Sequence, residues 1–482
     1  MNRYLVKLAE RLRPQQQEAL DKLDESGGLI LHHSMGSGKT VTFLTAAQRA
    51  LKDDKKKRVL IVAPASLVTN VDKELDKHGI KLDRSRLDVY SYEKAVNRAD
   101  ELDNNDYSLT ISDEAHKLRN NATKRSKILT DILSRGDKRI LSTGTANYNH
   151  IGDLAPLVNI AAGGKVLPTD PKEFENKFLK TVPKRRTLIE TVLNKPIEET
   201  TELANKGKLK KVFENYVHYY DAATDPAMKD KFPTMTEKTV DVEMSPEQMK
   251  YYKFVEGNIP FMLRMKVRHG LPLNKKEKAD LNSFAMGVRQ VSNSYRGYKV
   301  DPDSAEYTPK ILAAVKSLKK KLNNDPDYRG LVYSNFLEAG VNEYSRKLKE
   351  EGIDHTLFTG GLSQSEKEEM VKDFNKGKHK VLVISSSGAE GLDLKGVRHV
   401  QILDQHWNKQ KLAQVKGRAR RYESHAHLPE EKRNVEVENF RSVIPKPTFG
   451  KAPHSIDTYM SEVSDEKQET FDKIKKLMQE SN

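Results

Sequence analysis

Cysteine is absent from the 482-residue chain. This absence excludes disulfide bonds, thiolate metal sites and cysteine nucleophiles. Long apolar runs are absent too, since no uninterrupted stretch approaches the roughly 18 residues that a membrane-spanning helix needs. Residues 1–10 carry charges where a signal peptide would be apolar. We therefore expect an intracellular, soluble protein with no membrane partner.

Acidic side chains are outnumbered by basic ones, 69 against 84, which gives a formal net charge of +15. A basic balance favours a polyanionic partner but does not by itself identify a nucleic acid. The 14 histidines include close pairs, 32 with 33 and 425 with 427, that lack further ligands at metal-site spacing. We therefore expect no structural transition-metal site, and the motifs must decide the function.

Strand-like and helix-like stretches alternate in two blocks, which predicts parallel strands joined by right-handed helical crossovers. The predicted strands are 28–32, 58–62, 87–90, 108–112 and 139–141 in the first block, and 331–334, 356–358, 381–384 and 400–403 in the second. We therefore predict an α/β fold of two parallel-sheet lobes with helical insertions and a C-terminal helical segment. Functional loops should gather at the carboxyl ends of the strands.

The length favours two to four domains. We predict lobe 1 over 1–167, a helical insertion over 168–235, where strand patterns disappear and charge rises, and a second helical insertion over 236–300. Lobe 2 follows over 301–430. The segment 431–482 should add a strand near 435–439 and a helix over 457–478. Ser245 followed by proline is a typical helix start.

A glycine-rich sequence follows the first predicted strand: His33-Ser34-Met35-Gly36-Ser37-Gly38-Lys39-Thr40. Gly36 and Gly38 would let backbone N–H groups around Ser37 point at phosphate oxygens, and the helix that follows adds its positive dipole end. Lys39 is then expected to reach the β- and γ-phosphates and Thr40 to ligate Mg²⁺. His33 departs from the common pattern, which has its first glycine there. The sequence predicts ATP and Mg²⁺ as cofactors.

An acidic motif, Asp113-Glu114-Ala115-His116, follows the predicted strand 108–112. At the end of a strand, Asp113 could hold Mg²⁺ and Glu114 could polarise an attacking water molecule. An isolated Asp-Glu pair is usually solvated surface. Together with the phosphate loop, however, this pair favours ATP hydrolysis.

These motifs resemble those of superfamily-two helicases and translocases, and most closely those of the SWI/SNF-type DNA-dependent ATPases. The segments that carry the resemblance are 12–16, 63–67, 113–120, 142–146, 288–293, 333–336, 358–361, 385–394, 404–408 and 414–421. The resemblance spans residues 12–422 and implies two RecA-like lobes. The departures, such as Ala146 and Lys409 where proline is usual and His406 where an acid is common, concern details of the subgroup.

The resemblance also implies roles for single residues. Gln16 would contact adenine, Gly391 and Asp393 would lie at the nucleotide, and Arg418 and Arg421 would be arginine fingers. Nucleic-acid contact or coupling is implied for Pro64, Ser66, His116, Thr143, Thr145, Ser386, Trp407 and Gln414. Residues 405–421 contain six lysines or arginines and no acid. Such side chains could contact phosphates, although each alone could equally be part of a solvated helix face.

Our leading interpretation is a monomeric, ATP-dependent translocase on duplex DNA that has no sequence preference. It would remodel protein–DNA complexes or branched DNA in replication, recombination or repair, together with other proteins of those processes. A bacterial, phage or large-virus setting is expected, in the cytoplasm, the nucleoid or an infected host cell. The alternative is a helicase that separates DNA or RNA strands. A non-catalytic scaffold is opposed by the intact phosphate loop, acidic motif and arginines.

Overall fold

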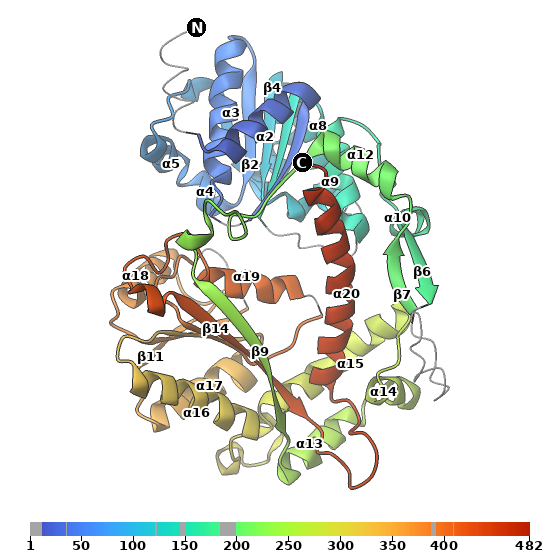
Figure 1. Cartoon of the computed structure of the whole chain (residues 1–482), viewed down its shortest axis with the longest axis vertical. Coiled ribbons are helices and arrows are strands. Elements are labelled where there is room, and N and C mark those ends of the chain that lie inside the picture. Colours follow the sequence, from blue (N-terminus) through green and yellow to red (C-terminus); the bar gives the residue numbers. More distant parts are fainter. Residues whose placement is uncertain are drawn as a thin grey trace. The chain divides into compact units, whose positions relative to one another are not determined.

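The computed structural model describes residues 12–34, 36–120, 123–144, 151–183, 199–386, 392–407 and 409–482. The chain forms two compact units (Figure 1). The first unit comprises Met1–Pro226 and Gln468–Asn482, and the second comprises Ala227–Lys467. Among the described helices, none is both long enough and apolar enough to cross a bilayer.

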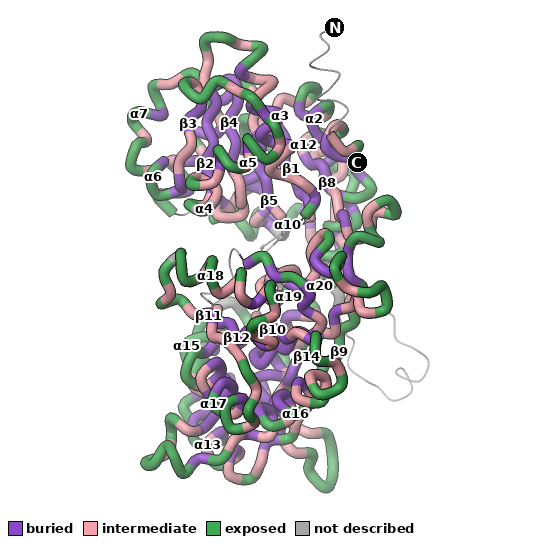
Figure 2. Tube along the Cα trace, turned by 90° about the vertical axis from the view of Figure 1, so that its left-hand side faces the viewer, coloured by how far each residue is buried: buried purple, intermediate pink, exposed green. Residues whose placement is uncertain are grey.

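The first unit is built on a six-stranded parallel sheet with the order β3-β2-β4-β5-β1-β8. Its strands are β1 (Gly28–His33), β2 (Arg58–Ala63), β3 (Leu87–Ser91), β4 (Tyr107–Asp113), β5 (Lys138–Thr143) and β8 (Val217–Tyr220). The first five confirm the predicted strands. Their residues are mostly buried, as Figure 2 shows, because helices cover both faces of a parallel sheet.

Alternate residues of β1 belong to different hydrophobic cores. Leu29 and Leu31 pack with side chains of α2 (Pro14–Ser26) and α3 (Lys39–Asp53) on one face of the sheet. Ile30 packs in the other core with α8 (Lys124–Ser134), α9 (Ala155–Ala162) and the carboxyl-terminal part of α20 (Ile456–Gln479). The period of two in the strand thus fixes which helices lie on each face.

Further helices of this unit are α4 (Ala65–Val68), α5 (Val71–His78), α6 (Tyr92–Asn97), α7 (Ala99–Asp103), α10 (Pro171–Phe178) and α12 (Lys206–Tyr216). The expectation that residues 168–233 lack strands is wrong. β6 (Leu179–Pro183) and β7 (Glu199–Leu203) form a separate antiparallel pair, and β8 joins the main sheet. The predicted domain boundaries remain predictions.

The second unit contains a six-stranded parallel sheet with the order β11-β12-β10-β13-β14-β9. Its strands are β9 (Thr234–Glu243), β10 (Gly330–Ser334), β11 (His355–Phe358), β12 (Val381–Ser385), β13 (His399–Ile402) and β14 (Asn434–Val443). Four of them confirm the strands predicted for the second block. The strand predicted near 435–439 is longer than expected, and it lies inside the sheet between β13 and β9.

The helices of the second unit are α13 (Pro246–Glu256), α14 (Phe261–Arg268), α15 (Lys275–Asn293), α16 (Pro309–Asn324), α17 (Glu343–Glu350), α18 (Gln364–Asn375), α19 (Lys409–Ala419) and the first part of α20. Ser245 caps α13 as predicted, because its Oγ accepts a hydrogen bond from the Gln248 N–H at 3.2 Å. Tyr252, Val288 and Met460 share a core that joins α13, α15 and α20. The predicted final helix is confirmed as α20.

Candidate active site

The phosphate loop connects β1 to α3, as predicted. Gly36 and Gly38 have φ angles of 81° and 87°, in the left-handed region that favours glycine. A Cβ atom at Gly38 would lie 2.4 Å from Nε2 of Gln16. The backbone conformation therefore favours glycine at residue 38, and a Cβ atom there would also displace the Gln16 amide.

Polar groups inside this loop are arranged in a way that suits a phosphate. Nζ of Lys39 donates to the carbonyl oxygens of His33, at 2.9 Å, and Ser34, at 3.2 Å, so the ammonium group lies over its own loop. The Oγ of Ser37 is buried and has no hydrogen-bond partner among the described residues. Because Thr40 lies in the first turn of α3, its N–H is among those that the helix itself leaves unpaired. A cation, a free hydroxyl and a helix amino terminus together fit a bound phosphate group.

Gln16 lies on α2 and supports the loop directly. Its Nε2 donates to the Gly38 carbonyl at 3.1 Å, and its Oε1 accepts from the Arg13 N–H at 2.9 Å. The side chain is buried, so it is held at the loop on both ends of its amide. A contact between Gln16 and adenine remains a prediction.

Asp113 ends β4, and Ser142 on the neighbouring strand β5 donates a hydrogen bond from Oγ to Oδ1 of Asp113 at 2.8 Å. Burial raises the pKa of Asp113, and the charge of Glu114 raises it further, whereas Ser142 and the Lys39 cation lower it. The last effect indicates that the structure brings Lys39 and Asp113 near one another. A carboxylate whose charge is unfavourable in this environment would be stabilised by a divalent cation.

Glu114 has a left-handed backbone, with φ 54° and ψ 44°, which is uncommon for a residue other than glycine. Backbone outliers of this kind cluster at functional sites. Its Oε2 lies 3.1 Å from Nδ1 of the partly buried His116, in the turn Ala115–Leu118. The hydroxyl of Tyr92 lies 2.7 Å from the carbonyl oxygen of Asp113 and 3.2 Å from that of Glu114. Tyr92 therefore holds the backbone that presents both acids.

The structure also explains His33, the departure from the common loop pattern. Its buried ring lies against that of His218 on β8, with Nε2 of His33 2.7 Å from Nδ1 of His218. Burial lowers the pKa of His33 well below its usual value and that of His218 to about 4. Both rings are thus neutral near pH 7 and share one N–H···N hydrogen bond. Sequence reasoning missed Tyr92 and His218, because neither lies within a recognisable motif.

The remaining predicted residues of the first unit follow the ends of its strands. Pro64 comes directly after β2 and begins the short helix α4, and Thr143 is buried at the end of β5. The backbone of Ser66 lies in α4. Thr145 and Ala146 lie outside the described residues. Pro64, Asp113 and Thr143 therefore share the carboxyl edge of β2, β4 and β5.

In the second unit, the two predicted finger arginines lie beside the segment that begins at Leu392. Nη1 of Arg418 is 3.5 Å from the Leu392 carbonyl oxygen, and Nη1 of Arg421 is 3.1 Å from Oδ1 of Asp393. Nε of Arg421 is buried and has no hydrogen-bond partner in the part of the chain that the structure describes. Gly391 lies outside the described residues. The structure thus unites Arg421 with Asp393, and the action of both arginines on ATP remains a prediction.

The basic run 405–421 is engaged within the chain. Lys411 donates to the Ser386 hydroxyl at 2.6 Å, and Arg420 donates to the Pro233 carbonyl at 3.2 Å. Lys409 pairs with Asp465, and Lys416 pairs with Glu237. Trp407 packs edge-on against Tyr459 with 6.4 Å between ring centroids, and Gln414 is partly buried on α19. These contacts are structural, so nucleic-acid binding by this run remains a prediction.

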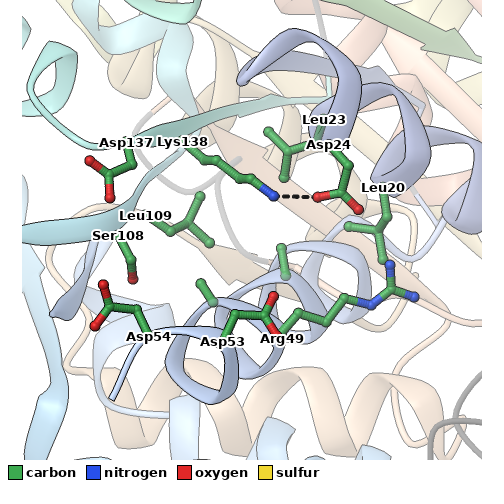
Figure 3. Close-up of a pocket in the computed structure, with 12 residues that line it drawn as sticks. Leu20, Leu23, Asp24, Arg49, Asp53, Asp54, Ser108, Leu109, Asp137 and Lys138 are labelled. Carbon is green, nitrogen blue, oxygen red and sulfur yellow. Dashed lines mark hydrogen bonds and ion pairs between the residues drawn. The ribbon is translucent and has the colours of Figure 1, made fainter. Parts of the chain in front are cut away.

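A pocket of about 210 Å³ opens at the amino ends of β4 and β5, between α2 and α3 (Figure 3). Its apolar lining includes Leu20, Leu23 and Leu109, and an ion pair between Lys138 and Asp24 lies at its rim. The phosphate loop and Asp113 lie at the carboxyl ends of the strands. This pocket is therefore separate from the candidate active site.

Comparison with known proteins identifies the family. The profile of the SNF2-related domain matches residues 82–296, that of the helicase conserved C-terminal domain 313–423, and that of the type III restriction enzyme, res subunit, 9–147. A protein of Acanthamoeba polyphaga mimivirus, named "Putative ATP-dependent RNA helicase L538", is 30% identical over 97% of this chain and 96% of its own length.

A more distant relative and a solved structure are also similar to this chain. The "Termination factor NPH-I homolog" of African swine fever virus is 24% identical over 86% of this chain and 69% of its own length. The structure of the Pyrococcus furiosus Hef helicase domain has the same fold, with 14% identity and a TM-score of 0.50 over 90% of this chain and 96% of that one. The chain therefore belongs to the SNF2-type superfamily-two helicases and is a nucleic-acid-dependent ATPase.

Proposed function

We propose that this ATPase moves along duplex DNA without separating its strands and has no sequence preference. The observation that supports ATP-driven movement best is the arrangement of the phosphate loop and the acidic motif at the carboxyl ends of β1 and β4 in one sheet. The match to the SNF2-related domain includes α13 and α14 and ends just after α15, which favours the duplex-tracking branch of the superfamily.

In the proposed reaction, Lys39 and the N–H groups of the loop bind the β- and γ-phosphates of ATP. Thr40 and Asp113 would hold Mg²⁺, and the cation, when bound, would neutralise phosphate charge. Glu114 accepts a proton from the attacking water molecule, and Tyr92 keeps the Glu114 backbone in place. Arg418 and Arg421 stabilise the charge that develops on the transferred phosphoryl group.

Contact with DNA is proposed to be made through its phosphates, since the chain carries a net charge of +15. Contacts of this kind release condensed counterions, so DNA affinity should fall steeply as salt rises and should depend little on sequence. Titration of salt against two unrelated duplexes measures both properties. A flat salt response, or a strong preference for one duplex, would contradict backbone tracking.

The central test compares ATP hydrolysis with linear duplex DNA, single-stranded DNA, forked DNA and RNA. We expect duplex DNA to stimulate hydrolysis most. The enzyme should also displace the third strand of a triplex while leaving a duplex intact. Lys39→Ala is the control that should abolish both activities. Separation of duplex strands at the rate of ATP hydrolysis would refute the proposal.

A strand-separating helicase on DNA or RNA is the second candidate. It is favoured by the separate antiparallel pair β6–β7, since such hairpins can act as wedges, and by the name of the mimivirus relative, which specifies RNA. The same assay distinguishes the two candidates.

The viral relatives also lead us to propose an infected host cell as the setting, with replication or repair proteins as partners.

A further inference from the structure

β9 is the outermost strand of the second sheet and, among the described strands, pairs only with β14. The pairing is unbroken from Thr234, opposite Asn434, to Glu243, opposite Val443. The N–H of Thr234 donates to the Arg433 carbonyl at 3.0 Å. Because successive residues of a strand direct their backbone groups to opposite sides, the even-numbered residues of β9 bond to β14 and the odd-numbered residues face away from it.

The outward backbone groups have no partner among the described residues. They are the N–H and C=O groups of Met235, Glu237, Thr239, Asp241 and Glu243. The residues around them are also uncovered, since residues 236–239 are all exposed. β9 therefore presents a continuous row of free hydrogen-bonding groups.

Edge strands of natural sheets are normally short, bulged, interrupted by proline or covered. β9 has ten residues, contains no proline or glycine, and has no break in its register with β14. Lys238, the one basic residue on the strand, pairs with Glu438 at 3.0 Å. This edge consequently has little protection against the addition of another strand.

The two antiparallel registers in which β9 would overlap most with a second copy of itself are disfavoured by charge. In an antiparallel pair centred on Thr239, Glu237 of each copy would lie opposite Asp241 of the other. In a pair centred on Lys238, the two lysines would face each other. Like charges directly opposite one another destabilise a sheet, so the edge is suited to a different strand.

We propose that the outer edge of β9 binds an extended segment of a partner protein, with lysine or arginine at alternate positions and β-branched residues between them. The odd-numbered face of β9 carries three acids and no base. Glu237 is held within the chain by Lys416 and Asn439, so Asp241 and Glu243 remain for a partner. Glu243 has no ion pair among the described residues, whereas Asp241 also binds Arg441 at 2.6 Å. The opposite face offers Val240 and Val242 to apolar side chains. Backbone pairing gives affinity and these side chains give specificity.

The probe is a short fluorescent peptide of alternating lysine and valine, and its binding to the full chain is followed by fluorescence anisotropy. Thr239→Pro removes one outward N–H, and it leaves the bonds to β14 because the N–H of residue 239 is not used there. We expect this change to weaken binding about tenfold or more. Thr239→Val, which keeps the N–H, is the matched control and should bind normally. Nucleic-acid-stimulated ATPase activity of both variants should equal that of the wild type, which also verifies folding.

A second peptide carries N-methyl groups along its pairing edge, so it keeps the charge but loses the hydrogen bonds. It should not bind. Equal binding of both peptides, normal binding to Thr239→Pro, or no binding of the unmodified peptide would each overturn the proposal. A dimer of the chain that Thr239→Pro dissolves would show that a second copy occupies the edge, which overturns it as well. The outcome is independent of whether the enzyme tracks duplex DNA.

Discussion

Acidification should destabilise the first unit through the histidines behind the phosphate loop. His32 and His218 are buried, and burial lowers the pKa of each from 6.5 to about 4. The unfolded chain therefore binds protons more readily than the folded one below pH 6.5. Each group contributes its full stability above pH 6.5 and loses it as the pH falls toward 4. At pH 5 the loss is about 2 kcal/mol for each histidine.

His218→Leu isolates one of these contributions. At pH 7.5 the variant should be less stable than the wild type by about 1–3 kcal/mol, because Nε2 of His33 loses its buried partner at 2.7 Å. At pH 5 the difference should nearly vanish, since the variant no longer has a residue 218 that must take up a proton on unfolding. His78→Gln on α5, outside the histidine pair, is the control that should follow the wild type.

The stability of the first unit is measured by hydrogen exchange of the peptide that contains β1. Exchange is followed in urea at pH 7.5, 6 and 5 and corrected for intrinsic exchange rates. Fluorescence of Trp407, the single tryptophan, reports the second unit as an internal reference. Parallel curves for His218→Leu and the wild type across this pH range would refute the reasoning, because they would show that His218 does not titrate between the folded and unfolded states.

Three further predictions concern the reaction. Glu114→Gln should bind a fluorescent ATP analogue almost normally but hydrolyse ATP at least about 100-fold more slowly. Lys39→Ala, in contrast, should also bind ATP weakly. Near-normal hydrolysis by folded Glu114→Gln would show that Glu114 does not have the assigned role. Tyr92→Phe keeps the ring but loses the bonds to the Asp113 and Glu114 carbonyls, so kcat should fall about tenfold at saturating ATP; an unchanged kcat would show that the hydroxyl has no positioning role. Arg421→Lys and Arg418→Lys should bind ATP and DNA normally and hydrolyse ATP on the order of 10³-fold more slowly; full recovery at saturating DNA would show that they are not fingers.

The sequence predicted most of both sheets, because their central strands are continuous apolar runs between helical patterns. β8 escaped prediction because it has only four residues, Val217–Tyr220, and follows a highly charged helix. β6 contains the adjacent polar residues Lys180 and Thr181, β7 is polar over residues 199–202, and neither strand is part of a six-stranded sheet. Strands that are short or partly polar give too weak a pattern to be distinguished from their surroundings.

The candidate site was predictable where its residues are neighbours in sequence. The phosphate loop and the acidic motif each carry their chemistry within a few residues. In contrast, Tyr92 acts on Asp113 and Glu114 from the beginning of α6, and His218 meets His33 from a strand 185 positions away. No local pattern marks such partners. They became visible only once the order of the strands was known.

The carboxyl-terminal part of α20 has a consequence for how the protein folds during synthesis. Ile474, Leu477 and Met478 pack in the same core of the first unit as Ile30 and Leu141, and the amide of Asn482 bonds to the Tyr219 backbone on β8. The ribosome adds these residues after the whole second unit. The first unit must therefore leave the ribosome with part of its core uncovered, and it can complete that core only after the second unit has been made. Contacts so distant in sequence are slow to form, so this apolar surface of the first unit stays exposed in the interval.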